Sequence, residues 1–426
     1  MTIRFNENNE VIEEMTYRAV LAGLELGEDI SYSMQELEGL AEAAGVTVAG
    51  QLIQKLERPN KATFFGKGKV FELCEFVEST GADMVIFNDE LSGIQLRNLE
   101  DACGVRVIDR TILILDIFAS RAVSREGSLQ IELAMLSYRL PRLTGFGKSL
   151  SRQAGGIGTR GPGETKRETD RRHIQKRMDD IRAELKKASS VRATQRTRRE
   201  KNSVPVVALV GYTNSGKSAL MNRMLDDVQR AEKSVFEKDM LFATLDTSHR
   251  KIDLDSSHSF ILIDTVGFVS RLPHTLVEAF KSTLEEVADA DLLLHVVDSS
   301  YDGYSFHMEV TDRVLKEIGA GDKEKIVVYN KKDIAPEEPI GGDFEHFFIS
   351  AKTGEGTDCL IERIREKIFA GRIRARLVLP YSRGDIVSYL CEKADVISME
   401  YSEEGTVLDA ELTEEDYGRY GSYAAL

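Results

Sequence analysis

The sequence predicts an α/β protein built from four consecutive parts. Three observations predict it: strands and helices alternate over the first 110 residues, two long helical stretches follow, and a second alternation begins near Ser203 with the apolar run VPVVALV. Alternation with short connections is typical of parallel sheets with right-handed crossovers. We place the boundaries of the four parts at residues 1–110, 111–202, 203–370 and 371–426.

Residues 1–110 predict a parallel α/β subdomain. Apolar runs at 17–24, 46–52, 84–87 and 105–108 are expected strands, and 34–44, 70–79 and 92–102 are expected helices. This part has no phosphate loop and no cluster of acids, bases or metal ligands. We therefore assign it no chemistry and no second nucleotide site.

Residues 111–202 predict a long antiparallel helical hairpin. Each helix has one narrow apolar stripe, and Pro141 is expected to help end the first helix because proline lacks the amide that continues the helix. Two such stripes are buried most simply against each other. The stripes consist of Leu129, Leu133, Leu136 and Leu140 in the first helix, and of Ile174, Met178, Ile181, Leu185 and Ala188 in the second.

The connection between the two helices, residues 144–163, contains seven glycines in the sequence TGFGKSLSRQAGGIGTRGPG. Glycines allow close backbone approach, and Lys148, Arg152 and Arg160 supply positive charge that suits phosphate. We interpret this segment as a loop that contacts a nucleic acid or nucleotide; a plain flexible linker is the alternative.

Charge is unevenly distributed along the chain, whose formal net charge is −15. Between Arg139 and Lys201 there are 19 Lys and Arg against 7 Asp and Glu. This segment indicates a basic surface suited to a polyanion, although a solvated helix face without a partner explains the charge equally well.

Other features predict a cytoplasmic protein. The polar, acidic N-terminus does not resemble a signal peptide, and no apolar run approaches the roughly 20 residues of a membrane span. The four cysteines show no metal-ligand spacing and are expected to be reduced. The last part, from Gly371, predicts a small α+β segment without a recognisable site.

A phosphate loop follows the first strand of the third part. The strand at 204–210 leads into GYTNSGKS and then a helical run, which is the context that this motif requires. Lys217 is expected to reach the β- and γ-phosphates, and Ser218 to supply an oxygen to magnesium (Mg²⁺). The motif residues are Gly211, Tyr212, Thr213, Asn214, Ser215, Gly216, Lys217 and Ser218.

Three further motifs, each after a strand, predict that the nucleotide is GTP or GDP. An aspartate at the end of a strand can hold the magnesium shell, and the glycine three residues later can approach the γ-phosphate. A carboxylate in the second motif can accept hydrogen bonds from the guanine N1–H and amino group, and a backbone amide in the third can meet the guanine O6. The motifs are Asp264, Thr265, Val266 and Gly267; Asn330, Lys331, Lys332 and Asp333; and Ser350, Ala351 and Lys352.

Three other residues bear on the chemistry. Thr244 is the candidate for the mobile threonine that coordinates magnesium, with Thr247 as the rival. Phe268 follows Gly267 where Ras-like enzymes have the glutamine that orients water, which predicts slow hydrolysis and help from a partner or another loop. Asn214 is a candidate to help hold a monovalent cation such as K⁺, or it only stabilises the turn. We expect Lys217, Thr244 and Gly267 to act in catalysis, and Ser218, Thr244 and Asp264 to be the metal ligands.

The sequence closely resembles the HflX family, in the Obg–HflX group of translation GTPases. The resemblance rests on VIFNDELSGIQLRNLE, GGIGTRGPGETKRETDRR, GYTNSGKSALMNRM, LFATLD and DTVGFVSRLPHTLVEAF, and covers roughly residues 15 to 370. The C-terminal tail departs from it. Ser215 and Thr247 stand where alanine and proline are frequent in the family, and neither removes a ligand.

The resemblance implies a P-loop GTPase that binds the large ribosomal subunit and splits stalled or idle ribosomes. The helical hairpin is then expected to approach ribosomal RNA. A GTPase acting in ribosome assembly is one alternative, and a regulatory GTPase with a protein partner is another. We expect a monomer that has no membrane span and does not bind DNA, with weak membrane association as an alternative to a purely cytoplasmic location.

Overall fold

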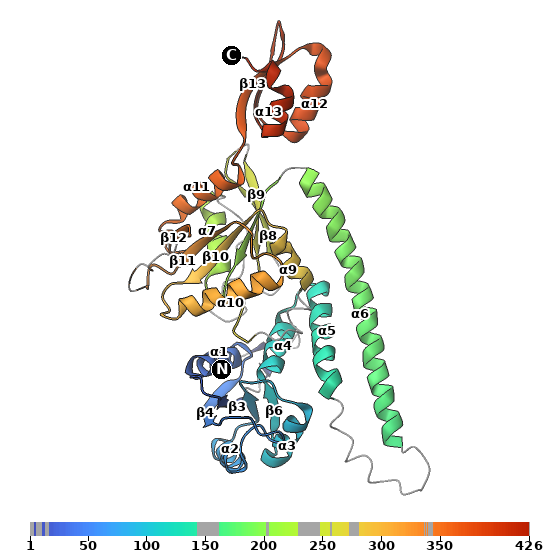
Figure 1. Ribbon diagram of the computed structural model, residues 1–426, viewed down its shortest axis with the longest axis vertical. Helices are drawn as coiled ribbons and strands as arrows, with labels where there is room; N and C mark the ends of the chain where they lie inside the picture. Colours follow the sequence, from blue (N-terminus) through green and yellow to red (C-terminus); the bar gives the residue numbers. More distant parts are fainter. Residues whose placement is uncertain are drawn as a thin grey trace. The chain divides into compact units, whose positions relative to one another are not determined.

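A computed structural model of the chain divides into two compact units. The first comprises Met1–Lys186, Met240–Phe242 and Ser270–Phe280, and the second comprises Lys187–Asp239, Ala243–Val269 and Lys281–Leu426. A short segment that begins at Ser270 thus belongs to the N-terminal unit. Figure 1 labels the helices and strands named below. The structure describes residues 4–5, 11–12, 17–142, 162–201, 204–228, 248–255, 258–271, 281–335, 337, 339 and 344–425.

A four-stranded parallel sheet forms the centre of the first unit, which confirms the predicted α/β class. The central strands β3 and β5 are almost wholly buried, whereas the edge strand β4 alternates between half-buried and exposed residues. A sheet covered on both faces requires such continuous apolar strands. The order is β4-β3-β5-β6, formed by β3 (Arg18–Glu25), β4 (Thr47–Lys55), β5 (Met84–Phe87) and β6 (Arg106–Asp109).

Helices connect these strands close to the positions that the sequence predicts. They are α1 (Ser31–Ala43), α2 (Lys67–Thr80) and α3 (Gly93–Cys103), and a separate antiparallel pair, β1 (Arg4–Phe5) and β2 (Val11–Ile12), precedes the sheet. Helix α3 begins with a capping box in which Ser92 and Gln95 satisfy each other's backbone amides. This local signal explains why the start of α3 could be predicted from sequence.

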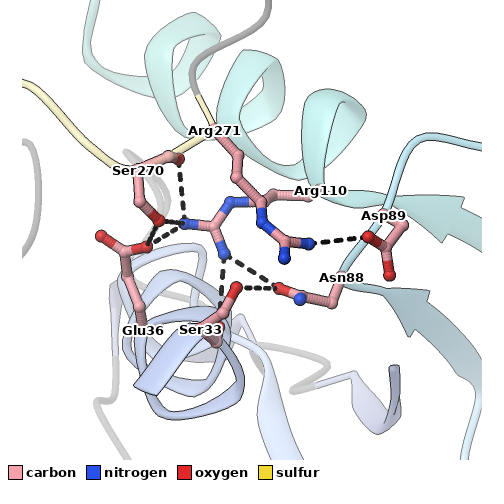
Figure 2. Close-up of polar contacts among 7 residues, drawn as sticks. All are labelled: Ser33, Glu36, Asn88, Asp89, Arg110, Ser270 and Arg271. Atoms are coloured by element: carbon pink, nitrogen blue, oxygen red, sulfur yellow. Dashed lines mark hydrogen bonds and ion pairs between the residues drawn. The ribbon is translucent and has the colours of Figure 1, made fainter. Parts of the chain in front are cut away.

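A buried polar cluster lies beyond the carboxyl ends of β5 and β6, centred on Arg110 (Figure 2). Arg110 and Glu36 form an ion pair in which both side chains are 3% exposed. The guanidinium also donates to Asn88 Oδ1 at 3.0 Å and to the Ser33 carbonyl at 3.3 Å. It further donates to the Ser270 hydroxyl and carbonyl, at 3.2 and 3.3 Å.

The Ser270 segment is therefore part of the folded first unit. Ser270 Oγ also donates to Glu36, and the next residue, Arg271, pairs with Asp89 at 2.7 Å. Arg271 adopts a φ of 53°, which is uncommon for a residue with a side chain. A buried ion pair requires additional hydrogen bonds to offset its desolvation, and Ser270 takes part in three of them with this pair.

Three helices follow the first-unit sheet: α4 (Arg110–Arg121), α5 (Arg125–Arg142) and α6 (Pro162–Lys201). Arg177 of α6 donates to both carboxylate oxygens of Glu132 at 2.7 Å, and Arg125 of α5 donates to Glu184 at 2.9 Å. From Arg125 to Glu132 the chain advances along α5, while their partners go back from Glu184 to Arg177 along α6. The pair runs antiparallel, as predicted.

The buried face of α5 differs from the predicted leucine stripe. Its fully buried apolar side chains are Ile131, Ala134 and Tyr138, whereas the four leucines of the stripe are half-buried. The expectation was wrong because α4, which the sequence interpretation did not separate from the hairpin, packs on α5 as well. In α6 the seam is as predicted, with Met178 and Ile181 buried. Pro141 lies one residue before the end of α5.

A six-stranded sheet forms the core of the second unit. The order is β12-β11-β10-β7-β9-β8, and every pairing is parallel except that of β8 with β9. The strands are β7 (Val206–Val210), β8 (Ser248–Asp253), β9 (Ser259–Asp264), β10 (Leu292–Asp298), β11 (Lys325–Asn330) and β12 (His346–Phe348). The helices are α7 (Lys217–Val228), α9 (Lys281–Ala288), α10 (Tyr304–Glu317) and α11 (Thr357–Ile368).

A small antiparallel sheet of order β13-β15-β14 ends the chain, formed by β13 (Ile373–Leu379), β14 (Asp395–Ser402) and β15 (Gly405–Leu412). It packs with α12 (Gly384–Lys393) and α13 (Glu414–Tyr420) around an apolar core. The predicted α+β segment is confirmed, with a central strand, β15, that the sequence interpretation did not identify. None of the described helices is both long and apolar enough to cross a membrane.

Candidate nucleotide-binding site

The predicted motifs lie at the carboxyl edge of the second-unit sheet. Strand β7 leads into the phosphate loop, β9 ends at Asp264, and β11 ends at Asn330. These strands pair in parallel with β10 or with each other, so their carboxyl ends meet at one edge. Ligands of open α/β sheets bind at this edge.

The phosphate loop has a backbone that only glycine permits at its first position. Gly211 has a φ of 149°, and a Cβ there would lie 2.2 Å from the Val296 carbonyl oxygen. Asn214 adopts a left-handed φ of 60° at the turn. Ser215 Oγ is buried and makes no hydrogen bond within the described part of the chain, which fits a loop whose polar groups are arranged for a ligand.

Lys217 begins α7 and is buried. Its ammonium donates to the carbonyls of Tyr212 at 2.7 Å and Gly211 at 3.1 Å, so it closes the loop on itself. Burial lowers the pKa of Lys217 to about 8, and the charge of Asp264 acts in the opposite direction. A phosphate next to this amine would favour its charged form.

Two hard oxygen donors meet beside Lys217. Ser218 Oγ donates to Asp264 Oδ2 at 2.6 Å, and Asp264 is fully buried. Hydroxyl and carboxylate oxygens are the ligands that Mg²⁺ prefers, so this pair fits the ion that the sequence predicts. Thr244 and its rival Thr247 lie outside the described residues.

The segment after Asp264 runs alongside the phosphate loop. Thr213 N–H donates to the Phe268 carbonyl at 2.7 Å, and Phe268 N–H donates to the Gly211 carbonyl at 3.1 Å. A Cβ on Gly267 would lie 2.6 Å from Thr213 Cα, so only glycine permits this approach. The Phe268 side chain is 2% exposed and points into protein rather than solvent. Thr265 Oγ1 fixes the start of the segment by donating to the Leu209 carbonyl at 2.7 Å.

The two predicted base-binding motifs are joined to each other and to the phosphate loop. Asn330 Nδ2 donates to the Ser215 carbonyl, and Asn330 Oδ1 accepts from the Ala351 amide, both at 2.9 Å. Ser350 Oγ donates to Asp333 Oδ1 at 2.7 Å. The structure thus brings all four predicted motifs together at one edge. Lys331 pairs with Asp298 at 2.7 Å, and Lys332 pairs with Glu355 at 2.7 Å.

Two residues that contact these motifs, Arg223 and His307, were not predicted from the sequence. Arg223 of α7 donates to the carbonyls of Ala351 and Lys352, although it belongs to no motif. His307 stacks on the ring of Tyr212, with centroids 3.8 Å apart. No signal in one sequence identifies such supports, because they are separated from the motifs that they contact by about a hundred residues.

Family models match four successive stretches of the chain. They describe a GTP-binding GTPase N-terminal region over residues 31–119, a GTP-binding GTPase middle region over 121–199, a 50S ribosome-binding GTPase over 206–331 and an HflX C-terminal domain over 342–419. The expectation that the family resemblance ends near residue 370 is wrong, since the last match reaches residue 419. The C-terminal segment consists of short elements without a motif, so the family resemblance is not visible in its sequence alone.

Curated relatives are similar over nearly the whole chain. A GTPase HflX of Caldanaerobacter subterraneus subsp. tengcongensis is 49% identical, with 93% of this chain and 91% of the relative covered. One of Lacrimispora saccharolytica is 42% identical, with 95% of each covered. One of Escherichia coli is 42% identical, with 88% of each covered.

Proposed function

We propose that this chain, which belongs to the HflX family of GTPases, is a nucleotide-controlled switch that acts on the large ribosomal subunit. The chain is a GTP hydrolase with a GTP-binding domain. The observation that carries the rest of the proposal is the combination of a complete set of guanine-nucleotide motifs at one sheet edge with a basic hairpin segment elsewhere in the chain.

The residues at the sheet edge have distinct roles in this proposal. Lys217 and the loop amides bind the phosphates, and Asp333 and the Ser350–Lys352 loop bind the base. Ser218, Asp264 and Thr244 hold magnesium, which when bound neutralises charge on the β- and γ-phosphates. Gly267 lets its backbone approach the γ-phosphate. Its amide and the ammonium of Lys217 then stabilise the charge that develops there during hydrolysis.

Hydrolysis should be slow without a partner. The position that could hold a water-orienting side chain is occupied by Phe268, which is apolar and buried. A partner or another loop must therefore orient the attacking water. A K⁺ ion near Asn214 would be a second way to stabilise the developing charge.

The basic segment between Arg139 and Lys201 supports a ribosomal RNA partner, because phosphate contacts dominate such binding. Arg152 and Arg160, in the glycine-rich loop outside the described residues, are the proposed RNA contacts. In this proposal GTP binding permits docking on the subunit, the docked protein separates stalled or idle ribosomes, and hydrolysis releases it.

The first test is GTP hydrolysis with and without purified ribosomes, together with sedimentation of the subunits in the presence of a non-hydrolysable GTP analogue. We expect strong stimulation and separated subunits. Stimulation without separation would instead favour the role in ribosome assembly. No response to ribosomes would overturn the proposed partner.

A second measurement separates RNA binding from a protein partnership. Replacing Arg152 and Arg160 by alanine should weaken subunit binding and reduce its dependence on salt. Replacing Arg374 and Arg376 of β13 is the matched control and should change neither. Unchanged binding in the first variant would favour a regulatory GTPase with a protein partner.

A further inference from the structure

Arg223 lies on the helix that begins at the phosphate loop but contacts the base-binding loop. Its Nε donates to the Ala351 carbonyl at 3.0 Å, and its Nη2 donates to the Lys352 carbonyl at 2.6 Å. The guanidinium also packs over Gly354, where a Cβ would lie 3.6 Å from it. A planar fork that engages two successive carbonyls fixes the orientation of the backbone more tightly than a single donor can.

The peptide bond transmits this orientation to the opposite side of the loop. The bond between Ala351 and Lys352 is trans and planar, so its N–H points away from its carbonyl. Because Arg223 holds the Ala351 carbonyl, the Lys352 N–H is directed away from Arg223. Rotation of this peptide would break the hydrogen bond to Nε.

The Lys352 amide is the donor of this loop best suited to a ligand. The Ala351 amide already donates to Asn330 Oδ1 at 2.9 Å, and the Thr353 amide donates to Ser350 Oγ at 3.1 Å. Ser350 also holds Asp333, so the loop is joined directly to the carboxylate expected to bind the other edge of guanine. The two edges of the base would thus be read by groups with a fixed mutual position.

Arg223 is itself held in place. Its Nη1 lies 3.7 Å from Asp227 Oδ1, one turn along α7, and Asp227 Oδ2 accepts from Thr357 Oγ1 at 3.0 Å. Thr357 begins α11, immediately after the loop. Asp227 of α7 therefore connects the Arg223 guanidinium to Thr357, the residue that follows the base-binding loop.

We propose that Arg223 is a positioning residue for guanine recognition, which orients the Lys352 amide toward the O6 atom of the bound base. It touches the nucleotide at no point and acts only through the backbone. The inference rests on the proposed guanine site. Arg223 lies outside the four motifs. In this proposal it determines how strongly the site prefers a base with an oxygen at position 6 over a base without one.

The test compares the binding of GDP and 6-thio-GDP, in which sulfur, a poor hydrogen-bond acceptor, replaces O6 while N1–H and the amino group remain. The wild-type chain should prefer GDP about tenfold, the value of one hydrogen bond. Arg223→Met keeps the aliphatic stem but removes the donors. We expect this variant to prefer GDP only about two- to threefold, through weaker GDP binding and unchanged 6-thio-GDP binding.

Arg363→Met is the matched control, since Arg363 lies on α11 of the same unit and pairs with Glu345 and Glu366. It should retain the wild-type preference. A wild-type preference in Arg223→Met, or an equal loss of affinity for both nucleotides, would overturn the role of Arg223. A wild-type chain without any preference for GDP would instead contradict the proposed contact between this loop and O6.

Discussion

A hydrogen bond from Ser350 orients the exposed carboxylate of Asp333, the residue proposed to bind guanine. The residue lies just after β11 and is exposed, but Ser350 Oγ donates to its Oδ1 at 2.7 Å. This contact turns the carboxylate toward the loop that carries Ala351 and Lys352. A carboxylate can accept from both N1–H and the amino group of guanine, whereas adenine offers no such pair of donors.

Asp333→Asn should therefore change the base preference. An asparagine side chain presents one donor and one acceptor, which suits xanthine because xanthine has a carbonyl in place of the amino group. We expect GDP affinity to fall by about a hundredfold or more and XDP affinity to rise, measured by competition binding. Asp312→Asn, which removes the charge that pairs with Lys325, is the control. Equal weakening for both nucleotides would contradict the assignment.

At this scale the sequence predicted the motif residues but not their supports. Lys217 and Asp333 could be proposed from the sequence because each belongs to a motif of residues that are neighbours in the chain. Arg223 contacts Lys352 across 129 residues, and Arg110 contacts Ser270 across 160. Nothing in the local sequence of either arginine distinguishes it from the many exposed arginines nearby.

Among the elements, the junction of β6, α4 and α5 depends on a buried carboxylate. Asp109 accepts from the Leu91 amide at 2.9 Å, caps α4 through the Ile112 amide at 3.1 Å, and accepts from the Tyr138 hydroxyl. Burial raises the pKa of Asp109 above its ordinary value of 3.8, and these hydrogen bonds oppose the rise. The contribution of Asp109 to stability is therefore fully present below pH 3.8 and decreases as pH rises through the folded-state pKa.

Tyr138→Phe should weaken this junction more at neutral than at acidic pH. The ring remains under Arg142, but the donor to Asp109 is lost, and hydrogen bonds to charged groups contribute about 1.5 to 3 kcal/mol. Hydrogen exchange of peptides from α4 and α5 should be faster than in the wild type, with a larger difference above the folded-state pKa of Asp109 than below it. Tyr17→Phe, at an exposed tyrosine, should have no effect. Unchanged exchange in α4 and α5 would show that the Tyr138 hydroxyl does not support this junction.

Elements with clear periodicity and boundaries were predicted well, and the others were not. Strand β5 was predicted to the residue because it is four buried apolar residues between polar neighbours. Helix α4 was missed because TILILDIF has the composition of a buried strand, and its helical state depends on the Asp109 cap and on packing against α1 and α5. Strand β15 was missed although it forms a tight hairpin with β14, in which Ser402 pairs with Gly405; only its pairing with β13 is non-local.

Across the whole second unit, the nucleotide domain and the C-terminal sheet have separate apolar cores. The core of the nucleotide domain contains residues between Val207 and Ile368, and that of the small sheet lies between Ala375 and Ala424. A polar contact joins the two, because His258 Nε2 lies 2.7 Å from Glu411 Oε2 while its Nδ1 faces Asp255.

A chain that ends at Ala370 should consequently keep its nucleotide site. We expect GDP affinity within about twofold of the full chain and a loss of about 1 kcal/mol of stability from the missing contact to His258. GDP titration and thermal unfolding measure the two effects, and Glu411→Gln in the full chain isolates the contact. Loss of GDP binding on truncation would mean that the C-terminal sheet shapes the site.

The late position of Ser270 also has a consequence for the order in which the protein can mature during translation. Arg110 and Glu36 leave the ribosome early, but the serine that completes their cluster is encoded 160 codons after Arg110. At about 5 to 20 residues per second, that separation is a delay of roughly 8 to 30 s. The N-terminal unit must therefore spend this interval with an incompletely satisfied ion pair. Its final native contacts form only after the phosphate loop and the motif that begins at Asp264 have been synthesised, and before the two base-binding motifs exist.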